Sequence, residues 1–133
     1  MKLRTLLAMT VAVLGISAAP SFAEEVVAIA SPAGDFLGVV LIDGSRCSRY
    51  DSNCVWNPYS NYGSDYSEQS VFNDYGQYGS EYGAHSICNQ SISYEETASL
   101  YLIADGSVSF FDVIGPDSET RIGYDLYIIA CSR

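Results

Sequence analysis

The residue best suited to acid–base catalysis in this chain is its single histidine, His85. A serine hydrolase would need this histidine beside a nucleophilic serine and an acidic residue. The sequence contains no Gly-x-Ser-x-Gly motif, which marks the nucleophile elbow of many hydrolases. We therefore interpret His85 as an exposed loop residue and predict no catalytic residues.

Carboxylates are the second group of side chains that could do chemistry. Two of them can hydrolyse a glycosidic bond, but Asp65 and Glu81 occupy equivalent positions of the repeat described below, which is typical of a solvated face. Calcium needs several oxygen ligands together, and Asp51-Ser52-Asn53 is only a weak fragment of a calcium-binding loop. We predict no metal ion or other cofactor.

Four cysteines form the third group, and in a small exported domain they favour two disulfides. They are Cys47, Cys54, Cys88 and Cys131, and none lies in a Cys-x-x-Cys motif that would indicate a zinc site. Cys47 and Cys54 are close enough in sequence to pair locally, which leaves Cys88 for Cys131. An alternative pairs Cys54 with Cys88 and Cys47 with Cys131. Three pairings are possible in all, and the sequence does not choose among them.

Aromatic residues recur in the middle of the chain, in units of 16 residues from about residue 54 to 94. Asn57, Asn73 and Asn89 set this period. Aromatic rings in a regular ladder can stack on sugar rings or anchor a protein partner, and the alternative is that they fill the core of the repeat. The candidate binding residues are Trp56, Tyr59, Tyr66, Phe72, Tyr75 and Tyr82.

Each unit has the signals of a short helix. Asn57 followed by Pro58 favours a helix start, and Gly63 favours a helix end. The aromatic residues of the unit lie three to four positions apart, which is helical spacing. The sequence predicts one or two helical turns per unit, with the asparagines as N-caps. On this interpretation Asn73→Ala destabilises the fold and Asn73→Asp does so far less.

The first 23 residues have the pattern of a secretory signal peptide. Lys2 and Arg4 precede an apolar stretch at residues 6–16, and small residues flank Phe22 before Glu24. The apolar stretch is shorter than the ~20 residues that a membrane-spanning helix needs. We predict cleavage before Glu24, a secreted or periplasmic protein without a membrane span, and a single small domain at residues 24–133.

The predicted mature chain is strongly acidic. Residues 24–133 contain 4 basic and 16 acidic residues, a formal net charge of −12. Proteins that bind a phosphate backbone neutralise it with Lys and Arg, so this charge argues against DNA, RNA or anionic lipid as a partner.

The flanks of the repeats read as strands. Apolar runs at 26–29, 36–42, 99–104 and 108–114 are separated by turn residues, with a hairpin turn at Asp105-Gly106. The last apolar segment, 124–131, fits a strand or a short helix. We predict an α+β or mainly β fold, in which both flanks form a small antiparallel sheet around inserted tyrosine-rich repeats, tied by disulfides.

The repeat pattern Ser-Ile/Val-x-Asn-x-Tyr-x-x-Tyr-Gly-Ser-x-Tyr-Ser resembles short repeats in exported bacterial proteins of unassigned function. In those proteins a Phe-Leu-Gly strand precedes the repeats, as residues 36–38 do here. The resemblance covers about residues 35–94, and the third unit departs from the pattern at residues 90–93. It implies an exported repeat protein and no catalytic residues.

These observations together predict a non-catalytic, exported structural or interaction module with a protein or polysaccharide partner in the cell envelope. The alternative is a polysaccharide-binding domain that uses an exposed aromatic ladder, and an exported hydrolase is a third, weaker hypothesis. The burial of the tyrosines distinguishes the first two.

Overall fold

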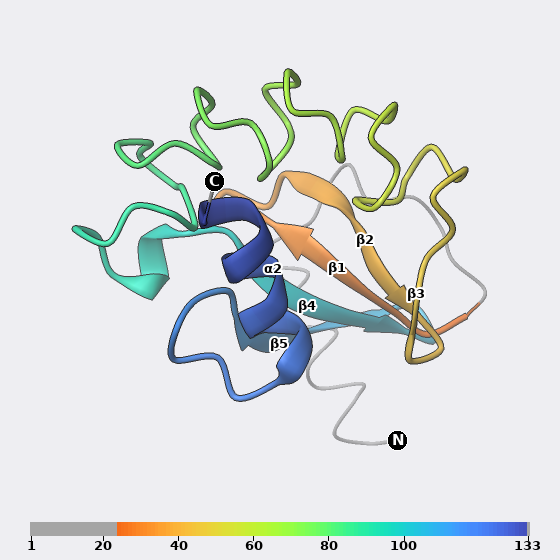
Figure 1. The fold of residues 1–133 in the computed structure, drawn as a ribbon. Helices are drawn as coiled ribbons and strands as arrows, with labels where there is room; N and C mark the ends of the chain where they lie inside the picture. The colour runs from red at the N-terminus through yellow and green to blue at the C-terminus, as the bar shows by residue number, and fades with distance from the viewer. Residues whose placement is uncertain (1–23, 133) are drawn as a thin grey trace.

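The structure is a computed structural model that describes residues 24–132 (Figure 1). The predicted signal peptide at residues 1–23 lies outside the described residues. Within residues 24–132, no helix is long and apolar enough to cross a lipid bilayer.

A five-stranded antiparallel sheet forms the centre of the fold, in the order β3-β2-β1-β4-β5. Its strands come from both flanks of the tyrosine-rich segment, as the sequence predicted. They are β1 (Val26–Ala30), β2 (Phe36–Ile42), β3 (Ser45–Arg46), β4 (Ser99–Ala104) and β5 (Ser107–Val113). One helix follows the sheet, so the coarse prediction of an α+β or mainly β fold is confirmed.

Two-residue turns connect two of the hairpins of this sheet, β2–β3 and β4–β5. Asp43 and Gly44 join β2 to β3 with φ of 49° and 84°, and Asp105 and Gly106 join β4 to β5 with φ of 52° and 74°. Positive φ at both central residues is the type I′ geometry that matches the twist of paired strands. β3 contains only two residues, which is why its polar sequence gave no strand signal.

The C-terminal segment, for which the sequence allowed strand or helix, is helix α2 (Arg121–Cys131). The Thr120 side chain caps its first turn by accepting the Gly123 N–H at 3.2 Å. Leu126 and Ala130, four residues apart, are buried on its inner side. A single 3₁₀ turn, η1 (Tyr94–Glu96), leads from the tyrosine-rich segment into β4.

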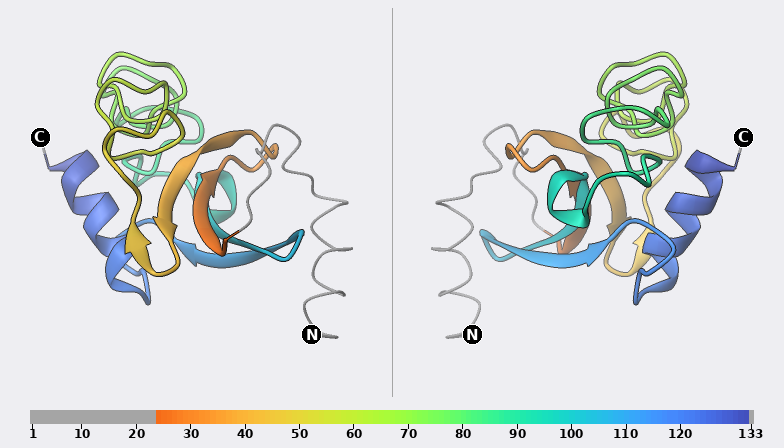
Figure 2. Two further views of the ribbon diagram at one scale, coloured as in Figure 1. Left: turned by 90° about the vertical axis from the view of Figure 1, so that its right-hand side faces the viewer. Right: turned by 90° about the vertical axis from the view of Figure 1, so that its left-hand side faces the viewer.

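Residues 47–93, which we call the turn region, consist of successive tight turns and contain no helix. The end-on views in Figure 2 show these turns as loops stacked one behind another along one side of the sheet. The prediction of one or two helical turns per unit is therefore wrong. In ten places a Ser, Asn or Asp side-chain oxygen accepts the backbone N–H two residues on, and such bonds compete with helix formation.

The turn region begins against β2, at a bulge in the pairing of β1 with β2. Val39 donates its N–H to the Asn53 carbonyl at 2.7 Å, and its own carbonyl accepts the Val55 N–H at 2.9 Å. Gly38 has φ of 109°, and a Cβ there would lie 2.6 Å from the Tyr62 Cβ and the Val55 Cγ1. Only glycine fits this strand position, because the backbone is left-handed and the first turn packs directly on it.

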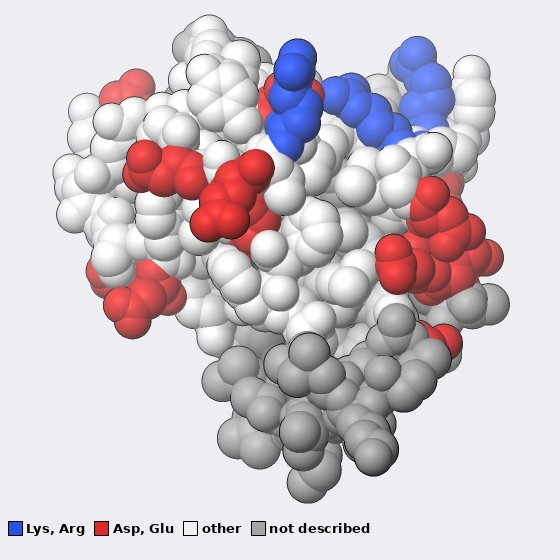
Figure 3. Space-filling model, turned by 90° about the horizontal axis from the view of Figure 1, so that it is seen from below, with Lys and Arg blue, Asp and Glu red and all other residues white. Residues whose placement is uncertain are grey.

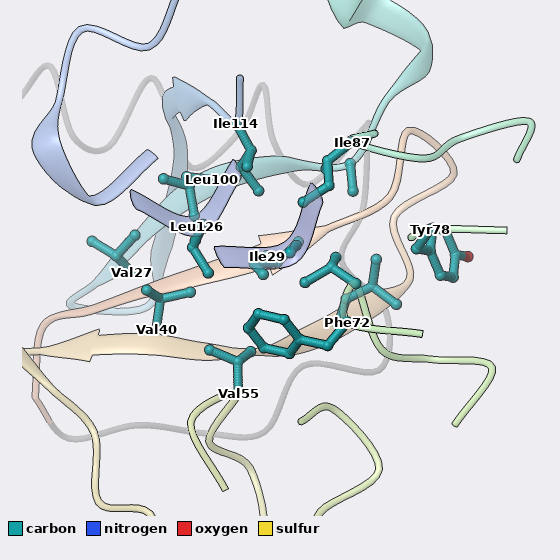
Figure 4. Close-up of a cluster of buried hydrophobic side chains, with 14 residues drawn as sticks. Val27, Ile29, Val40, Val55, Phe72, Tyr78, Ile87, Leu100, Ile114 and Leu126 are labelled. Atoms are coloured by element: carbon teal, nitrogen blue, oxygen red, sulfur yellow. The ribbon is translucent and has the colours of Figure 1, made fainter. Parts of the chain in front are cut away.

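The hydrophobic core lies between the sheet, the turn region and α2. Val55, Val71 and Ile87 occupy equivalent repeat positions, and all three are buried. Figure 4 shows that Val55, Phe72 and Ile87 extend from the turn region toward side chains of the strands and toward α2. The strand and helix residues that they meet include Ile29, Val40, Leu100 and Leu126.

Two disulfides tie the turn region to itself and to α2. Cys47 is bonded to Cys54, and Cys88 is bonded to Cys131. This is the pairing with the local Cys47–Cys54 bond, one of the three that the sequence allowed. The second bond joins the last unit of the turn region to the C-terminal end of α2, so it closes the fold around the core.

Candidate functional site

Five tyrosines of the turn region extend into solvent, and we call them the outer tyrosines. Each has between 87% and 96% of its side chain exposed. They are Tyr50, Tyr59, Tyr66, Tyr75 and Tyr82. Large aromatic side chains are seldom this exposed in number without a binding role, which makes them the candidate site.

The backbone under each outer tyrosine is fixed by the side chain two residues before it. Serine Oγ atoms accept the N–H groups of Tyr50, Tyr66 and Tyr82, each at 3.1 Å. Asparagine Oδ1 atoms accept those of Tyr59 and Tyr75 at 2.9 and 3.0 Å. These Ser-x-Tyr and Asn-x-Tyr bonds therefore fix the turn of the backbone beneath each outer tyrosine.

The repeat asparagines each bridge two turns. The Nδ2 groups of Asn57, Asn73 and Asn89 donate to the carbonyl six residues earlier, at 3.0, 3.0 and 2.9 Å. The Oδ1 atom of each accepts an N–H two residues later. The sequence had indicated that these asparagines are helix N-caps. That prediction is wrong, because no helix follows them. Both ends of each amide are used, which distinguishes asparagine from aspartate at these positions.

Two of the predicted binding residues face inward instead. Phe72 is 7% exposed and belongs to the core. Trp56 is partly buried, donates its Nε1–H to the Val40 carbonyl at 3.0 Å, and has its ring centroid 6.2 Å from that of Phe72. Neither Trp56 nor Phe72 lies with the outer tyrosines.

Tyr50 is an outer tyrosine that the sequence did not single out, although Ser48-x-Tyr50 matches the motif at Ser64 and Ser80.

A groove brings two outer tyrosines together. It has a volume of about 310 Å³ and lies between the turn region and the end of α2. Tyr75 and Tyr82 line it with the acidic side chains Asp74 and Glu81, and Ala130 and Cys131 form its other wall. The pair Tyr59 and Tyr66 occupies the equivalent positions one unit earlier, with the same bonds to its backbone.

A second hollow, of about 400 Å³, lies where the third unit departs from the repeat pattern. Ile92 and Pro116 contribute apolar surface to it. Its polar atoms are engaged with one another: the Gln90 Nε2 donates to the Tyr127 hydroxyl at 2.7 Å, and the Tyr94 hydroxyl donates to Asp117 at 3.1 Å. The first bond holds the turn region to α2, and the second holds η1 to the loop before α2.

Arginine side chains lie over aromatic rings at the start of the turn region. The Arg46 guanidinium carbon is 4.0 Å from the Trp56 ring centroid, and that of Arg49 is 6.0 Å from the Tyr50 ring centroid. Both distances lie within the range of a cation–π contact. Figure 3 shows the molecule from below. On this face the basic residues gather toward one edge, whereas acidic groups are spread over it.

His85, the side chain considered above for acid–base chemistry, is engaged in a structural contact. The His85 Nδ1 lies 2.8 Å from the Glu96 carbonyl oxygen. Asp65 and Glu81 are exposed on successive units. Among residues 24–132, no group of three or more His, Cys, Asp or Glu side chains is arranged to hold a metal ion.

The acid with the most perturbed surroundings is Asp112, near the end of β5. Burial alone would raise its pKa, but hydrogen bonds from the Thr120 hydroxyl and from the N–H groups of Thr120, Glu119 and Val113 lower the pKa below its ordinary value. The two Thr120 bonds to Oδ2 measure 2.5 and 2.9 Å. This carboxylate fixes the loop that leads into α2.

Inner tyrosines differ from the outer ones in their surroundings. Tyr78 is buried, and burial together with the nearby Asp35 carboxylate raises the pKa of its hydroxyl. Tyr101 is partly buried on β4, and burial raises its pKa too. These side chains belong to the packing of the fold and not to the candidate site.

No known protein family, curated protein or solved structure matches this chain.

Proposed function

We propose that the protein is a non-catalytic, exported binding module whose binding surface is formed by the outer tyrosines. The observation that carries this proposal is the exposure of five tyrosine rings, each of which has its backbone N–H donated to the side-chain oxygen of the residue two positions earlier. Tyrosine combines a large apolar ring with a hydroxyl, so it gives both contact area and a polar handle at an interface.

The rigid turns also favour binding on entropic grounds. A loop that becomes ordered only on association loses conformational freedom and thereby loses affinity. Here the side-chain bonds, the Cys47–Cys54 and Cys88–Cys131 disulfides and the buried Val55, Val71 and Ile87 hold the turn region before any partner arrives. Only the tyrosine rings remain to be ordered.

The proposal that the module is exported and non-catalytic is supported by two further features. Disulfides form and persist mainly in extracytoplasmic compartments, and both bonds here tie structural elements together. His85 and Asp112, the residues best placed by type for acid–base work, are engaged by backbone atoms. A structural or interaction role in the cell envelope does not require acid–base catalysis by these residues.

A polysaccharide is the second candidate partner, and the exposure of the rings favours it specifically. Flat aromatic rings stack on the faces of sugar rings, and the outer tyrosines repeat every 16 residues as a series of such platforms. Buried hydroxyls would have excluded this function, but at Tyr59, Tyr66, Tyr75 and Tyr82 the side chains are exposed.

Binding to a cell-envelope fraction tests the proposal. We expect the wild-type protein to be retained and a Tyr59→Ala/Tyr66→Ala/Tyr75→Ala/Tyr82→Ala variant to be released, with Tyr124→Ala on α2 as the matched control. Protease treatment of the fraction abolishes retention if the partner is a protein, whereas periodate oxidation abolishes it if the partner is a polysaccharide. Equal retention of the folded quadruple variant and the wild type would refute a binding role for the tyrosines.

A further inference from the structure

The second hollow lies where one tyrosine of the repeat departs from the position of its counterparts. Tyr62, Tyr78 and Tyr94 occupy equivalent positions, 16 residues apart. Tyr62 packs edge-on against Phe36 with ring centroids 5.1 Å apart, and Tyr78 is buried in the core. Tyr94 is only partly buried, and its hydroxyl donates to Asp117 in the loop before α2. The third tyrosine of the series therefore forms part of the wall of the hollow, whereas the first two belong to the packing of the fold.

The Tyr94 side chain is held in place by hydrogen bonds and by packing. Its hydroxyl donates to the Asp117 carboxylate at 3.1 Å and accepts the Asp117 N–H at 3.3 Å. A Cβ at Gly115 would lie 2.5 Å from the same hydroxyl, so the Gly115 backbone lies directly against this side chain. A ring fixed in this way loses little conformational freedom when a ligand packs on it.

Three polar atoms of the hollow keep the capacity for a further hydrogen bond. The Tyr127 hydroxyl accepts the Gln90 amide at 2.7 Å, and its own proton remains available to another acceptor. Among the described residues, nothing donates to Gln90 Oε1 or to Asp117 Oδ1. The side chains that line the hollow therefore offer a ligand one donor and two acceptors.

The charge of the hollow and this mixture of atoms limit the chemistry of a ligand. Among the described residues that line it, Asp117 is the only charged one, so a phosphate or carboxylate finds no cation there. An ammonium or guanidinium group has donors only, so it cannot accept the proton of the Tyr127 hydroxyl. A ligand hydroxyl both donates and accepts, and it therefore matches the polar atoms of this hollow.

We infer that the second hollow binds a neutral sugar residue of a polysaccharide. The faces of a sugar ring carry C–H groups that pack on apolar and aromatic side chains, which Ile92, Pro116 and Tyr94 supply here. The hydroxyls lie around the edge of the sugar ring, where the three polar atoms described above can bond to them. The volume of about 400 Å³ lies within the range of small-ligand sites, about 300–1,000 Å³.

This site is separate from the binding surface of the proposed function. None of the outer tyrosines is among the described residues that line the second hollow. A sugar bound there contacts the last unit of the turn region and α2, whereas Tyr75 and Tyr82 line the other groove. The inference therefore goes beyond the proposed function and can fail without it.

Titration of the purified protein with oligosaccharides tests the inference. The probes are the neutral hexamers cellohexaose, mannohexaose and chitohexaose, together with the chitosan hexamer, which is the cationic counterpart of chitohexaose. We expect at least one neutral hexamer to shift the NMR signals of the Gln90 side-chain amide and the Tyr127 ring. The ring of Tyr124, on the outer side of α2, is the internal control and should not shift. Binding of no neutral hexamer, or of the chitosan hexamer alone, overturns the inference.

Variants assign the binding to the hollow. Gln90→Ala/Tyr127→Phe removes one acceptor and one donor while it keeps the Tyr127 ring. We expect it to weaken the neutral hexamer roughly fivefold to tenfold, because each neutral hydrogen bond contributes about twofold to tenfold to affinity. The matched control, Gln69→Ala/Tyr124→Phe, makes the same changes outside the hollow and should leave the affinity unchanged. Equal affinities of the two folded double variants overturn the inference.

The quadruple tyrosine variant of the envelope experiment separates this inference from the proposed function. We expect it to bind the neutral hexamer as tightly as the wild type does. Loss of the hexamer in the quadruple variant, with unchanged binding by Gln90→Ala/Tyr127→Phe, retains the proposed function and overturns the sugar site in the hollow. Loss of the hexamer in Gln90→Ala/Tyr127→Phe alone supports this site, even where equal envelope retention refutes a role for the outer tyrosines.

Discussion

The Oδ1 of Asn73 accepts the backbone N–H of Tyr75 at 3.0 Å, so one of the more buried polar residues of the turn region positions its most exposed tyrosine. The other end of the same amide donates to the Ser67 carbonyl, also at 3.0 Å. Asn57 makes the equivalent pair of bonds under Tyr59. The residue that builds each turn is therefore also the residue that presents the ring.

Replacing Asn73 tests this double role. In Asn73→Asp the Oδ1 bond to Tyr75 is kept, but a carboxylate oxygen replaces the donor that faces the Ser67 carbonyl. A lost hydrogen bond and the repulsion of two oxygens cost about 1–3 kcal/mol, so we expect Asn73→Asp to lower the melting temperature by at least about 4 °C, as much as Asn73→Ala. Thermal unfolding followed by circular dichroism measures this.

The matched control is Asn61→Asp, at an exposed position of the same region. It adds the same charge and should leave the melting temperature nearly unchanged. A stable Asn73→Asp beside a destabilised Asn73→Ala would restore the simple cap, in which only the oxygen matters.

Glycines at equivalent positions, Gly63 and Gly79, close the turns. A Cβ at Gly79 would lie 2.5 Å from the carbonyl oxygens of Val71 and Asn73, which are backbone atoms and cannot move aside. Forced overpacking of this kind costs about 1–3 kcal/mol. We expect Gly79→Ala to lower the free energy of unfolding, measured with urea, by about 2 kcal/mol or more. Gln77→Ala, a nearby exposed position, should have little effect, and comparable losses in both variants would contradict the close contact.

The strands were predictable because local signals and burial agree in them. Apolar runs with β-branched residues end at turn residues, and β2 and β4 have the predicted bounds to the residue. The Asp-Gly pairs at 43–44 and 105–106 both make hairpin turns. The first of these pairs was a signal for β3, which sequence analysis passed over because the strand is so short.

The turn region was predicted poorly because two patterns compete in it. Tyrosines three to four residues apart match a helix, but Ser and Asn two residues before them bond to the tyrosine N–H groups and favour turns. The motifs Asn-x-Tyr and Ser-x-Tyr alternate at intervals of 9 and 7 residues within each unit of 16. That alternation separates the outer tyrosines from Tyr62 and Tyr78, and it would have identified Tyr50.

The candidate site was predicted in part for the same reason. Four of the six predicted residues are outer tyrosines, whereas Trp56 and Phe72 follow the buried Val55 and Val71 and continue into the core. Long-range packing against β2 decides their direction, and no local pattern in the sequence encodes it. The Cys88–Cys131 pairing likewise depends on the position of α2 relative to the last unit.

The two disulfides should contribute unequally to stability. The Cys88–Cys131 bond spans 43 residues and the Cys47–Cys54 bond spans 7. The loop-entropy model assigns about 4 kcal/mol to the longer loop and about 2 kcal/mol to the shorter one. We expect Cys88→Ala/Cys131→Ala to lower the free energy of unfolding by the larger amount, measured with guanidinium chloride.

The matched variant is Cys47→Ala/Cys54→Ala, which removes the same kind of bond from the short loop. The intact mass of the wild-type protein should lie four hydrogens below that of the reduced chain. A larger loss of stability in the short-loop variant would show that the contacts of the first turn with β2 outweigh loop entropy.

Acid should weaken the link between β5 and α2 through Asp112. Its pKa in the folded protein lies below the ordinary value of 3.8, because hydrogen bonds favour the charged form despite burial. A carboxyl whose pKa is lowered by folding stabilises the fold at pH values above its unfolded pKa, and this contribution is lost as the pH falls through the folded pKa. The contribution is therefore complete near neutral pH and declines below about pH 4.

Asp112→Asn removes this titration while keeping the shape of the side chain. At pH 7 we expect the variant to be less stable than the wild type by about 2 kcal/mol, because the amide nitrogen cannot accept the bonds from Thr120. The difference should shrink as the pH is lowered from 5 to about 2, since the wild-type carboxyl becomes protonated and loses its advantage. Urea unfolding at several pH values measures both curves, with Asp125→Asn on the exposed Arg121–Asp125 pair as the control. Curves for Asp112→Asn and wild type that stay parallel down to the lowest pH would show that the bonds to Thr120 do not depend on the charge of Asp112.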